Sequence, residues 1–238
     1  MLRDPTALRQ RLAEARLLLV FTPALAPDDD TALARLAAAA PWLGLVQVRP
    51  KALGRAGAVG DVTEARAARD LARRVLATLA EAGYPELPVM VNDRVDVAAL
   101  LLEEGVAGVH LGADDAPPAL ARALLGPDAL IGVSTHSLDD VLAASEGPAD
   151  LLGFGPTFAT ATKGYGDGAP ATAPRLLGPE TAWIAASAAA VPLFPIGGID
   201  LANIDELAEV GRAAVGSALL SAPDPARAAR ALFEALSH

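Results

Sequence analysis

The chain has 238 residues, of which 53% are hydrophobic, and its formal net charge is −10 at pH 7. Nucleic-acid binding favours a basic surface, so this acidic balance argues against it, whereas a local cluster of cations can still attract an anionic small molecule. The absence of cysteine excludes disulfides and thiolate metal sites.

The beginning of the chain is polar and predicts a helix rather than a signal peptide. Residues 1–16 read MLRDPTALRQRLAEAR, which lacks an apolar stretch. The longest weakly polar run, WIAASAAAVPLFPIGGI, is interrupted by two prolines and two glycines, so it predicts the end of a helix and a buried strand. We therefore expect a soluble, cytoplasmic protein with a leading helix over residues 1–15 and no contact with a membrane.

From residue 16 onward, short apolar runs alternate with amphipathic or alanine-rich segments. The apolar runs, each predicted to be a strand, cover residues 16–23, 43–50, 88–93, 108–112, 130–136, 151–158, 192–198 and 213–218. The segments predicted to be helices include residues 28–40, 62–83, 95–105, 117–126, 201–211 and 224–238. Several of these helices are expected to end at a glycine in the left-handed conformation, namely at 83, 105, 126, 147 and 211.

Eight strands, each followed by a helix, define the fold class. Strands that are short and continuously apolar are typical of a parallel sheet covered by helices. Eight such units in this length match an α/β fold of the (β/α)8 TIM-barrel type, with an open doubly wound sheet as the alternative. Because no linker or change of composition divides the chain, we expect one domain over residues 1–238, with an N-terminal helical extension.

Residue types that are rare in this chain gather where the predicted strands end. The chain has two Lys, two Asn, two Gln and three His, against 17 Arg. Of these rare residues, six follow strands: Gln47, Lys51, Asn92, His110, His136 and Lys163. A codon bias toward arginine would scatter the survivors over the helices, whereas a barrel enzyme collects its active-site residues at the C-terminal ends of its strands. We therefore predict a functional cluster there.

Glycines after the last two strands predict an anion site. Gly197-Gly198 ends one strand, and Gly216-Ser217 ends the next at the start of a predicted short helix. Glycine lets backbone N–H groups approach an anion closely, and phosphate sites in this position are common in such barrels. The alternative for Gly197-Gly198 is a tight end to the strand.

Two aspartates are the candidates for a metal site. Asp93 and Asp115 follow the third and fourth predicted strands, and carboxylate oxygens near a phosphorylated ligand suit Mg²⁺. Asp115 could instead cap the helix that follows it, and Asp114 could replace it as the ligand. For His110 and His136 we expect inward-facing core residues that make hydrogen bonds rather than catalytic bases.

Three cations are expected around the mouth of the barrel. Arg49 and Lys51 follow the second strand, and Lys163 follows the sixth, beyond Thr160 and Thr162. Their combined charge suits two phosphate groups on one ligand or two phosphorylated ligands. The glycine-rich segment after Lys163 could close over such a ligand.

The chain resembles the thiamine phosphate synthase family from about residue 17 to the last helix. The motifs that carry the resemblance occur in the family's order: QVRPK, VNDRVDVA, GVHLGADD, IGVSTH, GPTFATATK, IGGI and GSAL. The resemblance implies a transferase that joins 4-amino-5-hydroxymethyl-2-methylpyrimidine diphosphate to a thiazole phosphate and releases pyrophosphate. It differs at Pro50, where a charged residue is expected, and at Gly164, where a lysine or proline is frequent.

The resemblance also implies a role for each motif residue. The pyrimidine diphosphate would be held by Gln47, Arg49, Lys51, Asn92, Ser134 and Lys163, of which Arg49, Lys51, Ser134 and Lys163 would be catalytic. Mg²⁺ would be the cofactor, bound by Asp93 and Asp115. The thiazole phosphate would be held by Thr160, Thr162, Gly198, Gly216 and Ser217.

Three alternatives share the barrel fold. A thiazole tautomerase would keep a phosphate site without the diphosphate clamp, and a non-catalytic barrel would only bind a phosphorylated metabolite. A phosphosugar isomerase would need an isolated base opposite a phosphate, and none stands out. The pattern favours the synthase, with small-molecule substrates as its partners, and leaves open whether the chain forms a homo-oligomer.

Overall fold

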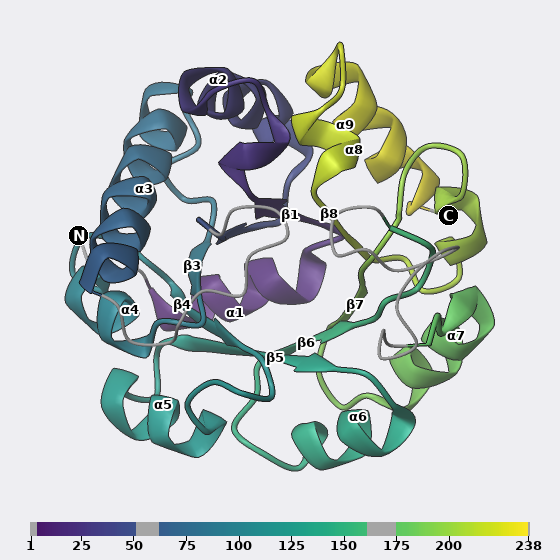
Figure 1. The fold of residues 1–238 in the computed structure, drawn as a ribbon. Coiled ribbons are helices and arrows are strands. Elements are labelled where there is room, and N and C mark those ends of the chain that lie inside the picture. The colour runs from purple at the N-terminus through teal and green to yellow at the C-terminus, as the bar shows by residue number, and fades with distance from the viewer. Residues whose placement is uncertain (1–3, 51–61, 161–174, 238) are drawn as a thin grey trace.

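Eight parallel strands form a barrel in the computed structural model, which describes residues 4–50, 62–160 and 175–237 (Figure 1). The strands are β1 (Leu17–Phe21), β2 (Leu45–Val48), β3 (Val89–Asn92), β4 (Gly108–Leu111), β5 (Leu130–Thr135), β6 (Leu151–Phe154), β7 (Leu193–Pro195) and β8 (Ala213–Val215). Each lies within its predicted range.

The order of the strands decides between the two predicted folds. Around the sheet it is β7-β6-β5-β4-β3-β2-β1-β8, so consecutive strands from β1 to β7 pair with one another and β1 also pairs with β8. A single parallel bridge between Ile196 and Ala214 joins the end of β7 to β8 and brings the two sheet edges together. The TIM barrel is confirmed, and the doubly wound sheet is wrong.

The helices surround the strands as an outer ring (Figure 1). They are α2 (Asp29–Ala39), α3 (Val62–Glu81), α4 (Val95–Leu101), α5 (Pro118–Leu125), α6 (Leu138–Ser145), α7 (Gly178–Ala188), α8 (Ser217–Leu220) and α9 (Pro225–Ala235), with short 3₁₀ turns η1 (Pro23–Leu25) and η2 (Ala40–Trp42) beside α2. None of the helices in the described ranges is long and apolar enough to cross a membrane.

Two local predictions are wrong. The helix expected over 201–211 is reduced to the 3₁₀ turn η3 (Ile204–Leu207), because the side chains of Asp200 and Asn203 accept hydrogen bonds from backbone N–H groups of this segment and favour turns. Gly147 does not adopt positive φ, unlike the other four predicted glycines. Here α6 ends without a left-handed residue, since the N–H of Glu146 donates to Leu142 and that of Gly147 to Ala144.

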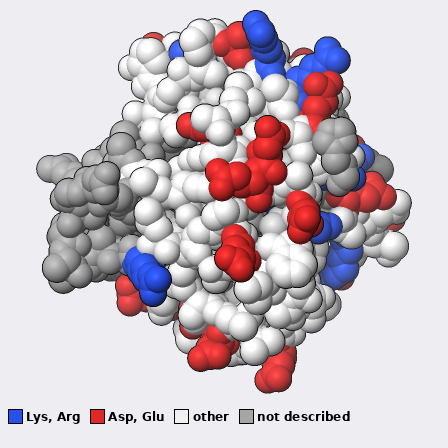
Figure 2. Space-filling model, turned by 90° about the vertical axis from the view of Figure 1, so that its right-hand side faces the viewer, with Lys and Arg blue, Asp and Glu red and all other residues white. Residues whose placement is uncertain are grey.

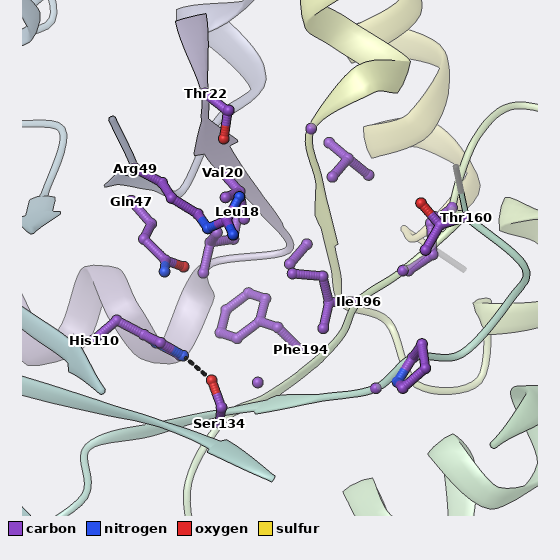
Figure 3. A pocket seen from close by; sticks show the side chains of 18 of the residues that line it. Leu18, Val20, Thr22, Gln47, Arg49, His110, Ser134, Thr160, Phe194 and Ile196 are labelled. Atoms are coloured by element: carbon purple, nitrogen blue, oxygen red, sulfur yellow. Dashed lines mark hydrogen bonds between the residues drawn. The ribbon is translucent and has the colours of Figure 1, made fainter. Parts of the chain in front are cut away.

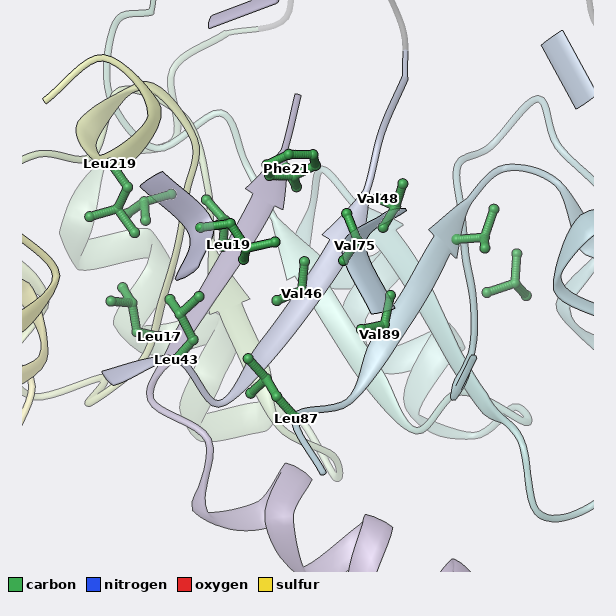
Figure 4. Packing of buried hydrophobic residues seen from close by; sticks show 14 of the residues in the cluster. Leu17, Leu19, Phe21, Leu43, Val46, Val48, Val75, Leu87, Val89 and Leu219 are labelled. Carbon is green, nitrogen blue, oxygen red and sulfur yellow. The ribbon is translucent and has the colours of Figure 1, made fainter. Parts of the chain in front are cut away.

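Alternation along the strands produces two apolar clusters. Leu17, Leu19 and Phe21 of β1 point outward and belong to the cluster between strands and helices (Figure 4). Leu18 and Val20 point inward and belong to the cluster that fills the barrel. The interior of the barrel is thus filled with side chains and is not an open channel.

A helix closes the lower end of the barrel. It is α1 (Pro5–Glu14), which begins at the predicted N-terminal extension with Asp4 as its cap, and its Leu8 and Leu12 belong to the interior cluster. Arg212, just before β8, donates to the carbonyls of Ala13 and Ala15 at the end of this helix. Among the described residues, α1 therefore covers the lower end of the barrel and leaves the opposite end, where the strands have their C-termini, for a cavity.

One face of the molecule is rich in exposed acidic side chains. On the face drawn in Figure 2, acidic side chains lie across the middle and basic ones lie toward the margins. This distribution agrees with the net charge of −10. A polyanion such as nucleic acid would be repelled by this face.

Candidate active site

A cavity of about 150 Å³ opens at the C-terminal ends of the strands. All eight strands or the loops that follow them contribute to its lining (Figure 3). Of the predicted site residues, it brings together Gln47, Arg49, Asn92, Ser134, Thr160, Gly198, Gly216 and Ser217. The predicted convergence of distant segments on one rim is therefore present for these eight residues.

One wall of the cavity is polar and buried. Gln47 on β2 and Asn92 on β3 are 6% and 8% exposed, and Gln47 Nε2 donates to Asn92 Oδ1 at 2.5 Å. This bond orients both amides and leaves Gln47 Oε1 as an acceptor and Asn92 Nδ2 as a donor for other partners. Such a pair can recognise a heterocycle that carries both a donor and an acceptor.

The polar wall continues onto β4 and β5. His110 is buried, and its Nε2 lies 3.0 Å from Ser134 Oγ; both side chains line the cavity (Figure 3). The expected inward-facing, hydrogen-bonded histidine is thus found at position 110. On the opposite side, Leu18 and Val20 of β1 together with Phe194 and Ile196 around β7 form an apolar wall.

The other histidine differs from its prediction. His136 is exposed at the cavity rim and is not a core residue. Its Nδ1 lies 2.5 Å from the carbonyl oxygen of Gly155, so this nitrogen carries the proton. Burial alone would raise the pKa of Asp140, but hydrogen bonds from the backbone N–H of His136 and from Ser137 hold this pKa below its usual value, so the rim loop is tied down by a carboxylate.

The glycines after β7 and β8 line the cavity beside Thr160. Gly197 and Gly198 have φ of 105° and 65°, a conformation that other residues rarely adopt. A Cβ on Gly198 would lie 2.1 Å from the carbonyl oxygen of Ala159, so the loops after β6 and β7 are in direct backbone contact. As predicted, α8 begins at Ser217 directly after Gly216.

The two predicted metal ligands lie outside the cavity lining, on neighbouring rim loops. Asp93 directly follows β3 and is the only described non-glycine residue with positive φ, 65°. Asp115 follows β4, and its Oδ2 accepts from the N–H of Gly112 at 2.7 Å. The N-cap position of α5 (Pro118–Leu125) is Pro117, so Asp115 is not the N-cap residue of this helix.

The donor set is small but chemically suited to magnesium. Among the described residues no group of three or more His, Cys, Asp or Glu could hold a metal ion. Mg²⁺ is commonly bound by only one or two carboxylates, with waters and substrate phosphates as its other ligands. Asp93 and Asp115 would supply two carboxylates of that kind, and the exposed Asp114 stays the alternative to Asp115. Lys51, Thr162 and Lys163 lie outside the described residues.

Comparison with known proteins identifies the family. The family model described as thiamine monophosphate synthase matches residues 17–222, which span all eight strands. The chain belongs to the thiamine monophosphate synthase family.

Its relatives agree over most of their length. A thiamine-phosphate synthase from Azorhizobium caulinodans is 42% identical over 191 residues, which cover 79% of each chain. Another from Thermus thermophilus is 39% identical over 224 residues, which cover 93% of this chain and 97% of that one. The solved thiamine phosphate pyrophosphorylase from Pyrococcus furiosus superposes with a TM-score of 0.71 at 25% identity, covering 96% of this chain and 97% of that one.

Family membership makes this chain a transferase of thiamine biosynthesis. Sequence reasoning nevertheless missed parts of its site. Thr22, which is 1% exposed at the end of β1, lines the cavity and was not predicted. The rule that strand ends carry site residues would have found it. The apolar wall gave no such signal, because its residues resemble any other buried strand residues.

Proposed function

We propose that this chain joins 4-amino-5-hydroxymethyl-2-methylpyrimidine diphosphate to a thiazole phosphate, giving thiamine phosphate and pyrophosphate. The observation that carries the proposal is a single cavity with a polar wall of paired side chains, an apolar wall opposite, and glycine-lined backbone at its outer end. These three features suit a flat heterocycle with hydrogen-bonding groups and a separate phosphate.

The pyrimidine binds in the deeper part of the cavity. Its ring lies between the apolar wall of Leu18, Val20, Phe194 and Ile196 and the polar wall, where the Gln47–Asn92 and His110–Ser134 pairs meet its amino group and ring nitrogens. The diphosphate extends toward Arg49 at the rim, with Lys51 and Lys163 contributing further charge on the strength of the motif resemblance.

The thiazole phosphate binds at the outer end. Thr160, Gly198, Gly216 and Ser217 line that part of the cavity, and Thr162 joins them on the motif resemblance alone. Backbone N–H groups at glycines can approach a phosphate closely. The thiazole nitrogen is then held near the pyrimidine methylene, which is a task of positioning.

The reaction breaks one C–O bond and forms one C–N bond. Pyrophosphate leaves the pyrimidine methylene with the bonding electrons, and the thiazole nitrogen supplies the pair for the new bond. Arg49 stabilises the charge that gathers on the leaving group, and more so in the transition state than before it. Mg²⁺, held by Asp93 and Asp115, would supply further neutralisation of the diphosphate when bound. No general base is needed for bond formation.

One assay tests the proposal. Purified protein is mixed with both substrates and Mg²⁺, and pyrophosphate and thiamine phosphate are followed together. We expect the two products in equal amounts. Conversion of a thiazole carboxylate phosphate isomer, with neither product formed, would instead identify a tautomerase, and binding without any turnover would identify a non-catalytic barrel.

A further inference from the structure

Two glycines in neighbouring strands make room for the ring of His110. Gly132 on β5 lies directly opposite His110 on β4 in the strand register, and Gly153 on β6 lies opposite Ser134. A Cβ on Gly132 would lie 2.4 Å from His110 Nδ1, and one on Gly153 would lie 3.3 Å from Cε1. The imidazole ring therefore rests against the backbone of both strands.

Neither glycine is required by its backbone conformation. Both lie in regular strands, and neither has positive φ. Glycine costs strand stability relative to a residue with a side chain, so a reason for it must lie in the space it frees. That space is filled by the imidazole.

The seated ring has one consequence for the cavity. With Gly132 and Gly153 beneath its ring, His110 is 6% exposed and holds its Nε2 3.0 Å from Ser134 Oγ. A serine hydroxyl otherwise rotates among several partners, and a fixed partner sets which direction its proton and lone pairs take. Ser134 lines the cavity beside the glycine at 153, so the direction set by His110 is presented to the ligand.

We propose that His110, seated by Gly132 and Gly153, is a positioning residue that orients the Ser134 hydroxyl toward the pyrimidine. His110 acts through Ser134 and not on the bond that breaks. The inference rests on the proposed function, because it names the substrate that Ser134 meets.

A double-mutant cycle tests the link between His110 and Ser134. In wild-type protein, His110→Ala should raise KM for the pyrimidine diphosphate about tenfold, the upper end for one hydrogen bond, with little change in KM for the thiazole phosphate. In the Ser134→Ala background the same substitution should change KM less than twofold. His110→Asn, which keeps a hydrogen-bonding side chain of smaller volume, should recover part of the loss.

The glycine seat is tested by its own pair of variants. Gly132→Ala should lower the melting temperature because its methyl group overlaps the ring, and Gly132→Ala combined with His110→Ala should recover much of that temperature. The double variant should still keep the raised KM of His110→Ala. Gly147→Ala, at an exposed position without positive φ where an added Cβ meets nothing closer than 3.4 Å, is the control for loss of glycine alone.

The outcomes separate the two claims. An active wild-type enzyme in which His110→Ala has the same effect on KM in both backgrounds would overturn the positioning role and leave the proposed function intact. A melting temperature of Gly132→Ala that His110→Ala fails to recover would overturn the seat. A wild-type protein that turns over neither substrate would overturn the proposed function and, with it, the role assigned to His110.

Discussion

Arg49 is the one strongly cationic side chain of the described cavity lining. Its position is fixed at the backbone, where its N–H donates to the carbonyl of Phe21 at 2.8 Å. Arg49→Ala should raise the activation free energy by about 2–4 kcal/mol and so lower kcat/KM roughly 30- to 1,000-fold, because the departing pyrophosphate loses a charge contact. Steady-state kinetics measure this effect, and Arg49→Lys should recover only part of it because lysine lacks the planar fork.

The matched control for Arg49 is Arg69 on α3. Arg69 pairs with its sequence neighbour Asp70 on the outer surface. Arg69→Ala removes the same charge far from the cavity and should leave kcat/KM unchanged. Equal losses in the two variants would mean that net charge, and not the position of Arg49, governs the rate.

Asp93 combines a strained backbone with a candidate metal ligand. Because its φ is 65°, alanine at this position would change both charge and conformational strain. Asp93→Asn is the sharper variant, since asparagine tolerates positive φ. We expect the Mg²⁺ concentration for half-maximal activity to rise at least tenfold with the melting temperature unchanged. An unaltered Mg²⁺ dependence would remove Asp93 from the metal site.

At the scale of elements, α1 covers the lower end of the barrel and seals its interior. Leu12 is 3% exposed and packs in the same cluster as Leu18 and Leu45. Leu12→Ala should lower the free energy of unfolding by about 2–5 kcal/mol, since it opens a cavity that the strands cannot close. Denaturant titration measures this loss.

A neighbour on the same helix provides the comparison for Leu12. Arg11→Ala, on the exposed face of α1, should change the free energy of unfolding by less than about 0.5 kcal/mol. A similarly small change in Leu12→Ala would show that α1 is loosely attached and does not seal the barrel.

The start of α4 carries a pH-dependent contribution to stability. Arg94 donates to both carboxylate oxygens of Asp96 and thereby lowers the pKa of this group below its usual value. A lowered folded-state pKa stabilises the protein above the unfolded pKa of about 3.9, and this stabilisation is lost as the pH falls through the folded value.

Asp96→Asn should therefore lower the melting temperature slightly at pH 6, by less than about 1 kcal/mol in stability because the side chain of Asp96 is 62% exposed. The difference from wild type should shrink as the pH falls below about 4. Melting curves of both proteins between pH 3 and pH 7 measure it. A difference that stays constant across this range would contradict the role of ionisation.

Helices and strands could be predicted from the sequence where the pattern that indicates them lies in adjacent residues. Apolar runs of strand length are a property of adjacent residues, so the eight strands and the leading helix could be predicted. The missing helix at 201–211 shows the limit: Asp200 and Asn203 compete for backbone N–H groups, and a 3.6-residue pattern does not reveal that competition.

The candidate site was predictable only in part for a related reason. Polar residues at strand ends could be found by their rarity, and four of them, Gln47, Asn92, His110 and His136, line one cavity. The fit between His110 and Gly132 depends on the register of β4 against β5. The two residues are 22 positions apart in the chain, so the sequence does not show that they are in contact. Contacts across strands need the three-dimensional structure.

At the scale of the whole molecule, the barrel has one weak seam. Strands β7 and β8 have three residues each, and a single bridge between Ile196 and Ala214 joins them. Pro195, the last residue of β7, has no N–H to donate across the seam. The same seam carries Gly198, Gly216 and Ser217, the residues proposed for the thiazole phosphate.

Because the proposed phosphate site lies on this seam, we predict that ligand binding stabilises the contact between β7 and β8. Backbone N–H groups of residues 213–217 should exchange with deuterated solvent faster than those of β5, a six-residue strand that pairs with β4 on one side and with β6 on the other. Inorganic phosphate, used as a probe of the thiazole phosphate site, should slow exchange at 213–217 and leave β5 unchanged. Hydrogen-exchange mass spectrometry measures both regions in one experiment, with chloride at matched ionic strength as the control. Equal protection by chloride would assign the effect to screening, and slow exchange at the seam without any anion would show that the single bridge suffices to hold the barrel closed.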